Sequence, residues 1–235
     1  MPTEHAPTSM TEHPGDAGLT GISDCWGDVG SEGMAHGYHH GNLRAAVLER
    51  AARIIAEQGP QELSLRALAA DLGVSHTAPR HHFGSREGVL RALAAEGFAE
   101  LERRLRDNRE SGKGFLEAGV EYVRFATECP AHFRVMFERD LTGPDDAELE
   151  AARGAAFTEL REGVKTLTEE GRSVPDVPAA LLAGWSMVHG IASLTLSGTL
   201  EVSGVRALFE DADLLTATRR SAGLLYGDVG ESSEG

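Results

Sequence analysis

Hydrophobic residues recur three or four positions apart along most of this chain, a spacing that places them on one face of an α-helix. The first such face consists of Leu43, Val47, Ala51, Ile54 and Ile55. Gly59 and Pro60 follow directly and should end this helix. The polar positions between the apolar ones predict a helix with one buried and one solvated side.

Serine residues mark the expected starts of the next three helices, because a serine side chain can cap the free N–H groups of a helix. We expect Ser64, Ser75 and Ser85 to cap the second, third and fourth helices, and Gly73 to end the second. The apolar faces are Leu65, Leu68 and Leu72 in the second helix and Leu90, Leu93, Phe98, Leu101 and Leu105 in the fourth.

The rest of the chain continues the helical spacing, interrupted by glycine and proline. Further helices are predicted over 113–128, 131–138, 145–170, 178–198 and 204–226. No stretch alternates as a strand would. The sequence therefore predicts an all-α protein of about nine helices. We expect a helix-turn-helix head at 37–86 and a helical-bundle domain for ligand binding and dimerisation at 87–226.

Both ends of the chain differ from this body. Residues 1–36 have no lysine or arginine, six acidic residues and many glycines, serines, threonines and prolines. Such a segment has no apolar face to bury, so we expect an acidic disordered tail. Residues 227–235 predict a second disordered tail. The N-terminal segment shows no secretory signal, and two cysteines, Cys25 and Cys129, provide no disulfide framework, which favours a cytoplasmic location.

One segment, residues 177–200, is apolar enough that a membrane-spanning helix has to be considered. Residues 177–200 contain no Asp, Glu, Lys or Arg, and about 20 mainly apolar residues can cross a bilayer. Several polar side chains and three glycines within the segment favour a helix buried in protein, between two subunits, over a membrane span. Gly184, Gly190 and Ala192 would let another helix approach closely, so we expect an arginine at Ala192 to disrupt a dimer.

Charge is distributed unevenly along the chain. The net charge is −15, which taken alone argues against a nucleic-acid partner. Residues 38–86 nevertheless carry six arginines against four acidic residues, a net charge of +2, with five histidines besides. A locally basic module on an acidic body is the distribution expected of a protein that presents one face to phosphates.

The segment 63–75 (LSLRALAADLGVS) has the features of two short helices that cross steeply. Ala69 is small enough for a close approach, and Gly73 can adopt the left-handed conformation that the turn needs. The following positions would then face a groove of DNA. An ordinary helical hairpin is the alternative interpretation of this segment alone.

The surrounding residues resemble the tetracycline-repressor (TetR) family in segments 38–44 (YHHGNLR), 73–83 (GVSHTAPRHHF) and 84–87 (GSRE). The resemblance implies DNA contacts from Tyr38, His39, Ser64, Arg66, Ser75, His76, Thr77, Arg80, His81 and Arg86. The chain departs from the family where Arg80 replaces the usual tyrosine, but arginine is also a competent phosphate ligand. Pro79 should end or bend the third helix, leaving a short recognition helix.

A second resemblance lies in 130–137 (PAHFRVMF) and 185–190 (WSMVHG), which are similar to the family's C-terminal subtype named for Trp, His and Gly. It implies an effector site formed by Phe133, Phe137, Trp185 and His189, although both Trp185 and His189 could simply be core residues. No metal site is expected, because His39, His40, His76, His81 and His82 point different ways and have no cysteine nearby.

The sequence as a whole predicts a regulator of transcription, most often a repressor in this family. We expect a homodimer, paired through 178–198 and 204–226, that binds an inverted-repeat operator with half-sites about 34 Å apart. A small-molecule effector would release it, and no cofactor is needed. The alternatives are a DNA-architectural protein without a ligand and a small helical enzyme, but no catalytic motif supports the enzyme.

Overall fold

The computed structural model describes residues 43–144, 146–172, 174, 176–209 and 212–227. Across these residues the chain forms eleven α-helices and two 3₁₀ helices, and no strand. This confirms the all-α prediction, and short helices in the connections raise the number above nine. The two expected tails and the segment with Tyr38, His39 and His40 lie outside the described residues, apart from Gly227.

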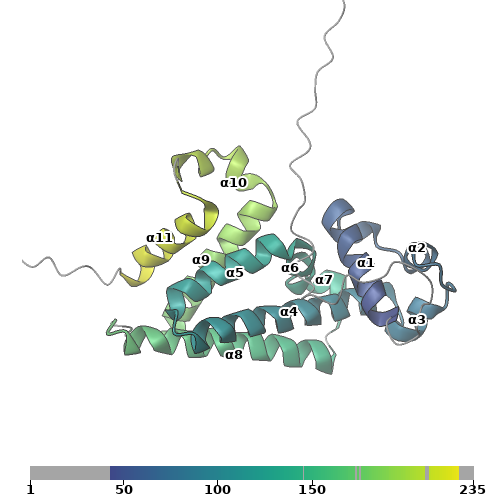
Figure 1. Ribbon diagram of the computed structural model, residues 1–235, viewed down its shortest axis with the longest axis horizontal. Coiled ribbons are helices and arrows are strands. Elements are labelled where there is room, and N and C mark those ends of the chain that lie inside the picture. The colour runs from purple at the N-terminus through teal and green to yellow at the C-terminus, as the bar shows by residue number, and fades with distance from the viewer. Residues whose placement is uncertain (1–42, 145, 173, 175, 210–211, 228–235) are drawn as a thin grey trace, which may run out of the picture.

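A small three-helix head occupies one end of the molecule (Figure 1). It consists of α1 (Leu43–Gln58), α2 (Leu65–Asp71) and α3 (Ala78–Phe83), with the 3₁₀ turn η2 (Pro60–Glu62) between α1 and α2. The predicted apolar face of α1 is buried, as are Leu63 and Leu68 from the following segment. These side chains give the head its own part of the hydrophobic core.

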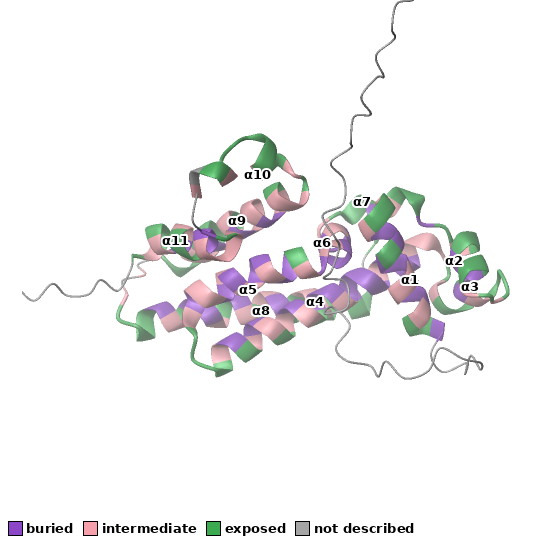
Figure 2. Cartoon of the chain, turned by 45° about the horizontal axis from the view of Figure 1, so that its top comes forward, coloured by how far each residue is buried: buried purple, intermediate pink, exposed green. Residues whose placement is uncertain are grey.

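Helix α4 (Arg86–Glu110) leaves the head and runs the length of the C-terminal domain. Its start is capped as predicted, because the Ser85 Oγ accepts a hydrogen bond from the Gly88 N–H at 3.2 Å. Helices α1, α5, α6 and α8 all pack against it. Buried positions therefore occur on several sides of α4 (Figure 2).

The C-terminal domain surrounds α4 with two layers of helices. The first comprises α5 (Gly114–Glu128), α6 (Pro130–Met136), α7 (Arg139–Thr142) and α8 (Ala147–Glu169). The second comprises α9 (Val177–Leu196) and α11 (Leu214–Tyr226), which both pack on α5. Ion pairs join the helices, from Arg109 to Glu159 and from Arg219 to Glu117.

The expectation of one helix over 204–226 is wrong. The structure has α10 (Thr199–Val202), η3 (Arg206–Phe209) and then α11. Helix α11 starts later because the Asp213 Oδ1 accepts a hydrogen bond from the Thr216 N–H at 2.7 Å and caps it there. The short elements form an arch beyond the end of α9 (Figure 1).

Cys129 lies buried between α5 and α6, and Cys25 lies outside the described residues. The expectation about the cysteines therefore stays a prediction.

Candidate DNA-binding surface and effector site

The turn between α2 and α3 has the geometry that its sequence predicts. Gly73 adopts φ +64°, in the left-handed region, and Ala69 is buried at the crossing of the two helices. The Val74 N–H donates to the Ala69 carbonyl at 3.0 Å and closes the turn. Val74 itself packs against the core, so the residues after it remain outside.

The start of α3 differs from the expectation at Ser75. Thr77 is the residue before the first turn, and the hydroxyls of Ser75 and Thr77 share a hydrogen bond of 3.1 Å. Pro79 lies in the first turn of α3, where its missing N–H costs nothing and its fixed φ suits a helix start. It therefore begins the helix and does not end it. The expectation of a short recognition helix is confirmed, since α3 has six residues.

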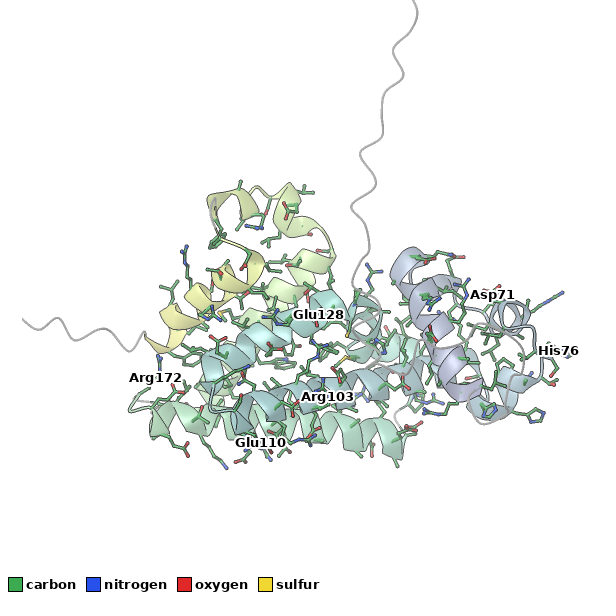
Figure 3. The ribbon with its side chains drawn as sticks, viewed as in Figure 1. Asp71, His76, Arg103, Glu110, Glu128 and Arg172 are labelled. Atoms are coloured by element: carbon green, nitrogen blue, oxygen red, sulfur yellow. The ribbon has the colours of Figure 1, made fainter. Side chains whose placement is uncertain are left out.

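An open hollow of about 740 Å³ lies between α2 and α3. Its walls are formed by Leu65, Arg66, Ala69, Ala70, Val74, His76, Thr77 and Arg80. Four of the predicted DNA-binding residues thus share one concave surface. Figure 3 shows His76 at the end of the head that lies farthest from the C-terminal domain. Ser64, Ser75 and His81 are exposed nearby but do not line the hollow.

The arginines of the head separate into two groups. Three have carboxylate partners: Arg44 pairs with Glu96 and Glu148, Arg50 with Asp71, and Arg53 with Glu49. Within the described residues, the side chains of Arg66 and Arg80 form no ion pair or hydrogen bond, and both line the hollow. The unpaired positive charge of the head therefore lies on the surface that the helix-turn-helix turns outward.

Arg86 has a different place from the one its position in the family suggested. Its Nε donates to the Leu63 carbonyl at 3.1 Å and its Nη2 to the Pro60 carbonyl at 2.5 Å. Both carbonyls belong to the turn between α1 and α2. This guanidinium holds the turn in place, so we expect Arg86 to contribute more to stability than to DNA contact, and its contact with DNA stays a prediction.

The four residues predicted for an effector site come together in the C-terminal domain. The His189 ring lies 4.7 Å from Phe137, 5.4 Å from Phe133 and 5.8 Å from Trp185, measured between ring centroids. Tyr122 joins this aromatic cluster from α5. Sequence reasoning missed Tyr122, because nothing in the apolar face of α5 indicates which residue of a distant helix covers it.

Hydrogen bonds within the aromatic cluster orient the histidine. The Trp185 indole N–H donates to the Tyr122 Oη at 3.3 Å, and the Tyr122 Oη lies 2.9 Å from the His189 Nδ1. The indole can only donate, which leaves the tyrosine proton free for Nδ1; we assign this direction, which puts the proton of a neutral His189 on Nε2. Burial lowers the pKa of His189 and favours this neutral form. Burial also raises the pKa of Tyr122.

Two spaces adjoin the aromatic cluster. A small pocket of about 20 Å³ lies between α5, α9 and α11, bordered by Tyr122, Trp185 and Tyr226. Its volume suits one water molecule and nothing larger. A groove of about 550 Å³ lies on the other side, between the head, α6 and α9. Phe133, Phe137 and His189 line the groove.

Helices α9 and α11 leave a broad apolar surface exposed. Leu182 is 61% exposed and Leu224 is 88% exposed, and Leu194 and Leu225 are exposed as well. By length and composition α9 could cross a membrane, but the core helix of a soluble protein passes the same test. Only 17% of its apolar window is buried within this chain. Exposed apolar surface of this extent marks an interaction site.

Two of the small residues expected on that exposed surface face inward. Ala192 is fully buried within its own subunit, and Gly184 adjoins the Tyr226 hydroxyl of α11. Only Gly190 has open space beside it. An arginine at Ala192 would therefore disturb the core of the subunit, and Leu182 and Leu194 are the better probes of an interface.

Two sequence families match this chain. A family described as bacterial regulatory proteins, tetR family, matches residues 47–93. A second, described as tetracyclin repressor-like, C-terminal domain, matches residues 115–218. Together the two matches cover more than half of the chain and correspond to the head and the C-terminal domain. Neither description names the Trp-His-Gly subtype, which stays a prediction.

Curated relatives are regulators of transcription. The uncharacterized HTH-type transcriptional regulator Rv0681 of Mycobacterium tuberculosis is 25% identical over 177 residues, which are 74% of this chain and 79% of that protein. The HTH-type transcriptional repressor AcnR of Corynebacterium efficiens is 36% identical over 83 residues. This second match spans 34% of the chain and 44% of the repressor.

Solved structures share the fold. A protein of unknown function from Rhodococcus sp. RHA1 superposes with a TM-score of 0.65 at 27% identity, over 81% of this chain and 97% of that one. The TetR-family transcriptional regulator PfmR from Thermus thermophilus gives a TM-score of 0.56 at 22% identity, over 78% of this chain and 98% of that one.

The outward-facing helix-turn-helix on an all-helical C-terminal domain, together with these relatives, defines a DNA-binding regulator of transcription and not an enzyme. The chain belongs to the tetracycline-repressor (TetR) family.

Proposed function

We propose that this protein is a homodimeric repressor that binds an inverted-repeat operator and leaves it when a small-molecule effector binds the C-terminal domain. The observation that carries the proposal is the placement of Arg66 and Arg80, two cations without carboxylate partners among the described residues, on the hollow of the helix-turn-helix. His76 and Thr77 lie on the same surface, where they can contact the edges of bases. Tyr38 and His39 remain proposed contacts as well.

The exposed apolar surface of α9 and α11 supports pairing of two copies. A symmetric dimer buries the same patch of both subunits, and the exposed Leu182, Leu194, Leu224 and Leu225 are the side chains that we propose for such a patch. Pairing through it would place two heads at fixed separation. The operator should then contain two half-sites about 34 Å apart, or one helical turn of DNA.

Selection of operator DNA from a random pool tests this proposal. We expect an inverted repeat to be enriched, and a mutation in either half-site to weaken binding. A metabolite screen for release of the selected DNA tests the effector. Enrichment of a single unrepeated site would contradict a dimeric repressor.

A ligand-independent DNA-binding protein is the second candidate, because the space between α5, α9 and α11 is only about 20 Å³, too small for a metabolite, and the larger groove is open at the surface. The metabolite screen separates the two candidates. A protein that keeps its operator in the presence of every compound would favour the second.

A further inference from the structure

The groove of about 550 Å³ joins both parts of the molecule. The residues that line it are Pro60, Phe133, Arg134, Phe137, Glu138, His189, Ser193, Leu196 and Ser197. Pro60 belongs to η2 of the head, and the others belong to α6 and α9 or follow them directly. A molecule in this groove would therefore contact the head and the C-terminal domain at once.

The polar groups of the groove favour an anion. With the Tyr122 proton assigned to Nδ1, the Nε2–H of neutral His189 is a donor toward the groove. Arg134 contributes a half-buried guanidinium, and Ser193 a hydroxyl one helical turn from His189. Such donors match a carboxylate. The exposed Glu138 also lines the groove and offsets part of the positive charge of Arg134, so a ligand with one negative charge suits the groove better than one with two.

The remaining walls of the groove favour an apolar body on this anion. Phe133, Phe137, Leu196 and Pro60 present hydrocarbon surface. The two phenylalanine rings lie 5.3 Å apart between centroids and pack on His189. Aromatic groups add to such rings in offset or edge-to-face arrangements. An aromatic carboxylate matches both the polar and the apolar parts of the groove.

Arg134 also connects the groove to the DNA-binding head. Its Nη1 donates to the Ile55 carbonyl, in the last turn of α1, at 3.2 Å. This is the one hydrogen bond of the Arg134 side chain within the described residues. The same carbonyl accepts from the Gly59 N–H at 3.0 Å. Only one of the five guanidinium N–H groups is engaged by the described residues, so the others are free for a carboxylate. A bidentate pair with a charged acceptor is stronger than the bond to this neutral carbonyl and would turn the guanidinium toward the groove.

We propose that the groove binds an aromatic monocarboxylate, and that this ligand draws Arg134 away from the Ile55 carbonyl and thereby loosens the head from the C-terminal domain. The inference rests on the proposed function and gives its effector a chemical class. By thermodynamic linkage, operator DNA must weaken binding of the carboxylate by the same factor by which the carboxylate weakens operator binding.

Calorimetry with 3-phenylpropanoate, using the full chain without DNA, tests the site. We expect binding of the carboxylate and about tenfold weaker binding of the neutral 3-phenylpropanamide, because one charged hydrogen-bonded pair is lost. Arg134→Gln should lower the affinity for 3-phenylpropanoate by about tenfold for the same reason. Arg139→Gln, a matched loss of one exposed arginine outside the groove, should leave it unchanged.

Any of three results would overturn the proposal. These are equal affinity for the acid and the amide, an unchanged affinity of Arg134→Gln for the acid, and no binding of the acid at all. Should Arg134→Gln fail to fold, Ser193→Ala carries the test, with an expected loss of about threefold. Release of the selected operator by 3-phenylpropanoate, abolished in Arg134→Gln, is expected for the coupling, and retention would overturn it. Failure to select any operator would overturn the proposed function while leaving the calorimetric result intact.

Discussion

The head and the C-terminal domain expose opposite kinds of surface. In the head, Arg66 and Arg80 face outward without carboxylate partners among the described residues. In the C-terminal domain most arginines are paired with acidic residues, as Arg103 is with Glu100 and Asp107. The domain leaves leucines of α9 and α11 exposed instead.

This contrast explains how a protein of net charge −15 can bind DNA. Phosphates respond to cations within about one Debye length, roughly 8–10 Å in physiological salt. Two unpaired arginines on one concave surface therefore attract a nearby phosphate more strongly than the acidic residues of the C-terminal domain, which lie farther away, repel it. The location of unpaired charge, and not its sum over the chain, indicates the nucleic-acid surface.

The largest effect should come from the apolar surface. Leu182→Glu together with Leu194→Glu places two charges on it and should give a monomer. Operator affinity should fall by about 100-fold or more, because a single head holds only one half-site. Sedimentation and a gel-shift titration measure the two results. Ala155→Glu, on the exposed side of α8, is the control, and a double mutant that stays dimeric would place the interface elsewhere.

The next effect should come from the unpaired cations. Arg66→Ala with Arg80→Ala should reduce the slope of log affinity against log salt by about two, since each phosphate contact contributes about one. Fluorescence anisotropy with the selected operator at several salt concentrations measures this slope. The paired Arg103→Ala should leave it unchanged. If the unmodified protein, the double mutant and Arg103→Ala all show the same slope, the hollow between α2 and α3 does not contact DNA.

Arg86→Ala should act on stability and leave the salt slope unchanged. Its guanidinium satisfies the Pro60 and Leu63 carbonyls, and loss of these bonds should cost about 2 kcal/mol of unfolding free energy. Urea denaturation measures the loss. A stable variant with a reduced salt slope would instead assign Arg86 to the DNA.

The smallest effect concerns the aromatic cluster. Burial lowers the pKa of His189 in the folded protein, so the unfolded chain binds more protons once the pH falls below about 6.5. The free energy of unfolding should therefore decrease with acidification from that pH. His189→Gln should reduce this decrease. Identical pH dependence in both proteins, followed by urea denaturation, would contradict a desolvated histidine.

Sequence reasoning succeeded where a feature depends on neighbours in the chain. The turn at Gly73 and the cap at Ser85 follow from the conformational freedom of glycine and the reach of a serine hydroxyl. The prediction that the segments with Phe133 and Trp185 lie together came from the family resemblance. Periodicity alone identifies an apolar face but not the helix that covers it.

The errors concern partners that are distant in sequence or choices between adjacent residues. The interior position of Ala192 depends on how α9 packs on the rest of the domain. Arg86 differs from Arg66 because the turn after α1 places two backbone carbonyls within hydrogen-bond distance of the Arg86 guanidinium. At Ser75 two neighbouring hydroxyls could start the same helix, and Pro79 in the first turn fits a start at Thr77.

Helix α4 belongs to both parts of the molecule, and this has a mechanical consequence. Its 25 residues span about 37 Å at 1.5 Å per residue. A rigid rod of that length acts as a lever: tilting it by about 5° at one end displaces the other by about 3 Å. In a two-fold pair the displacements at both heads add. A rearrangement too small to reorganise the core of the C-terminal domain can therefore bring two heads out of step with successive turns of DNA.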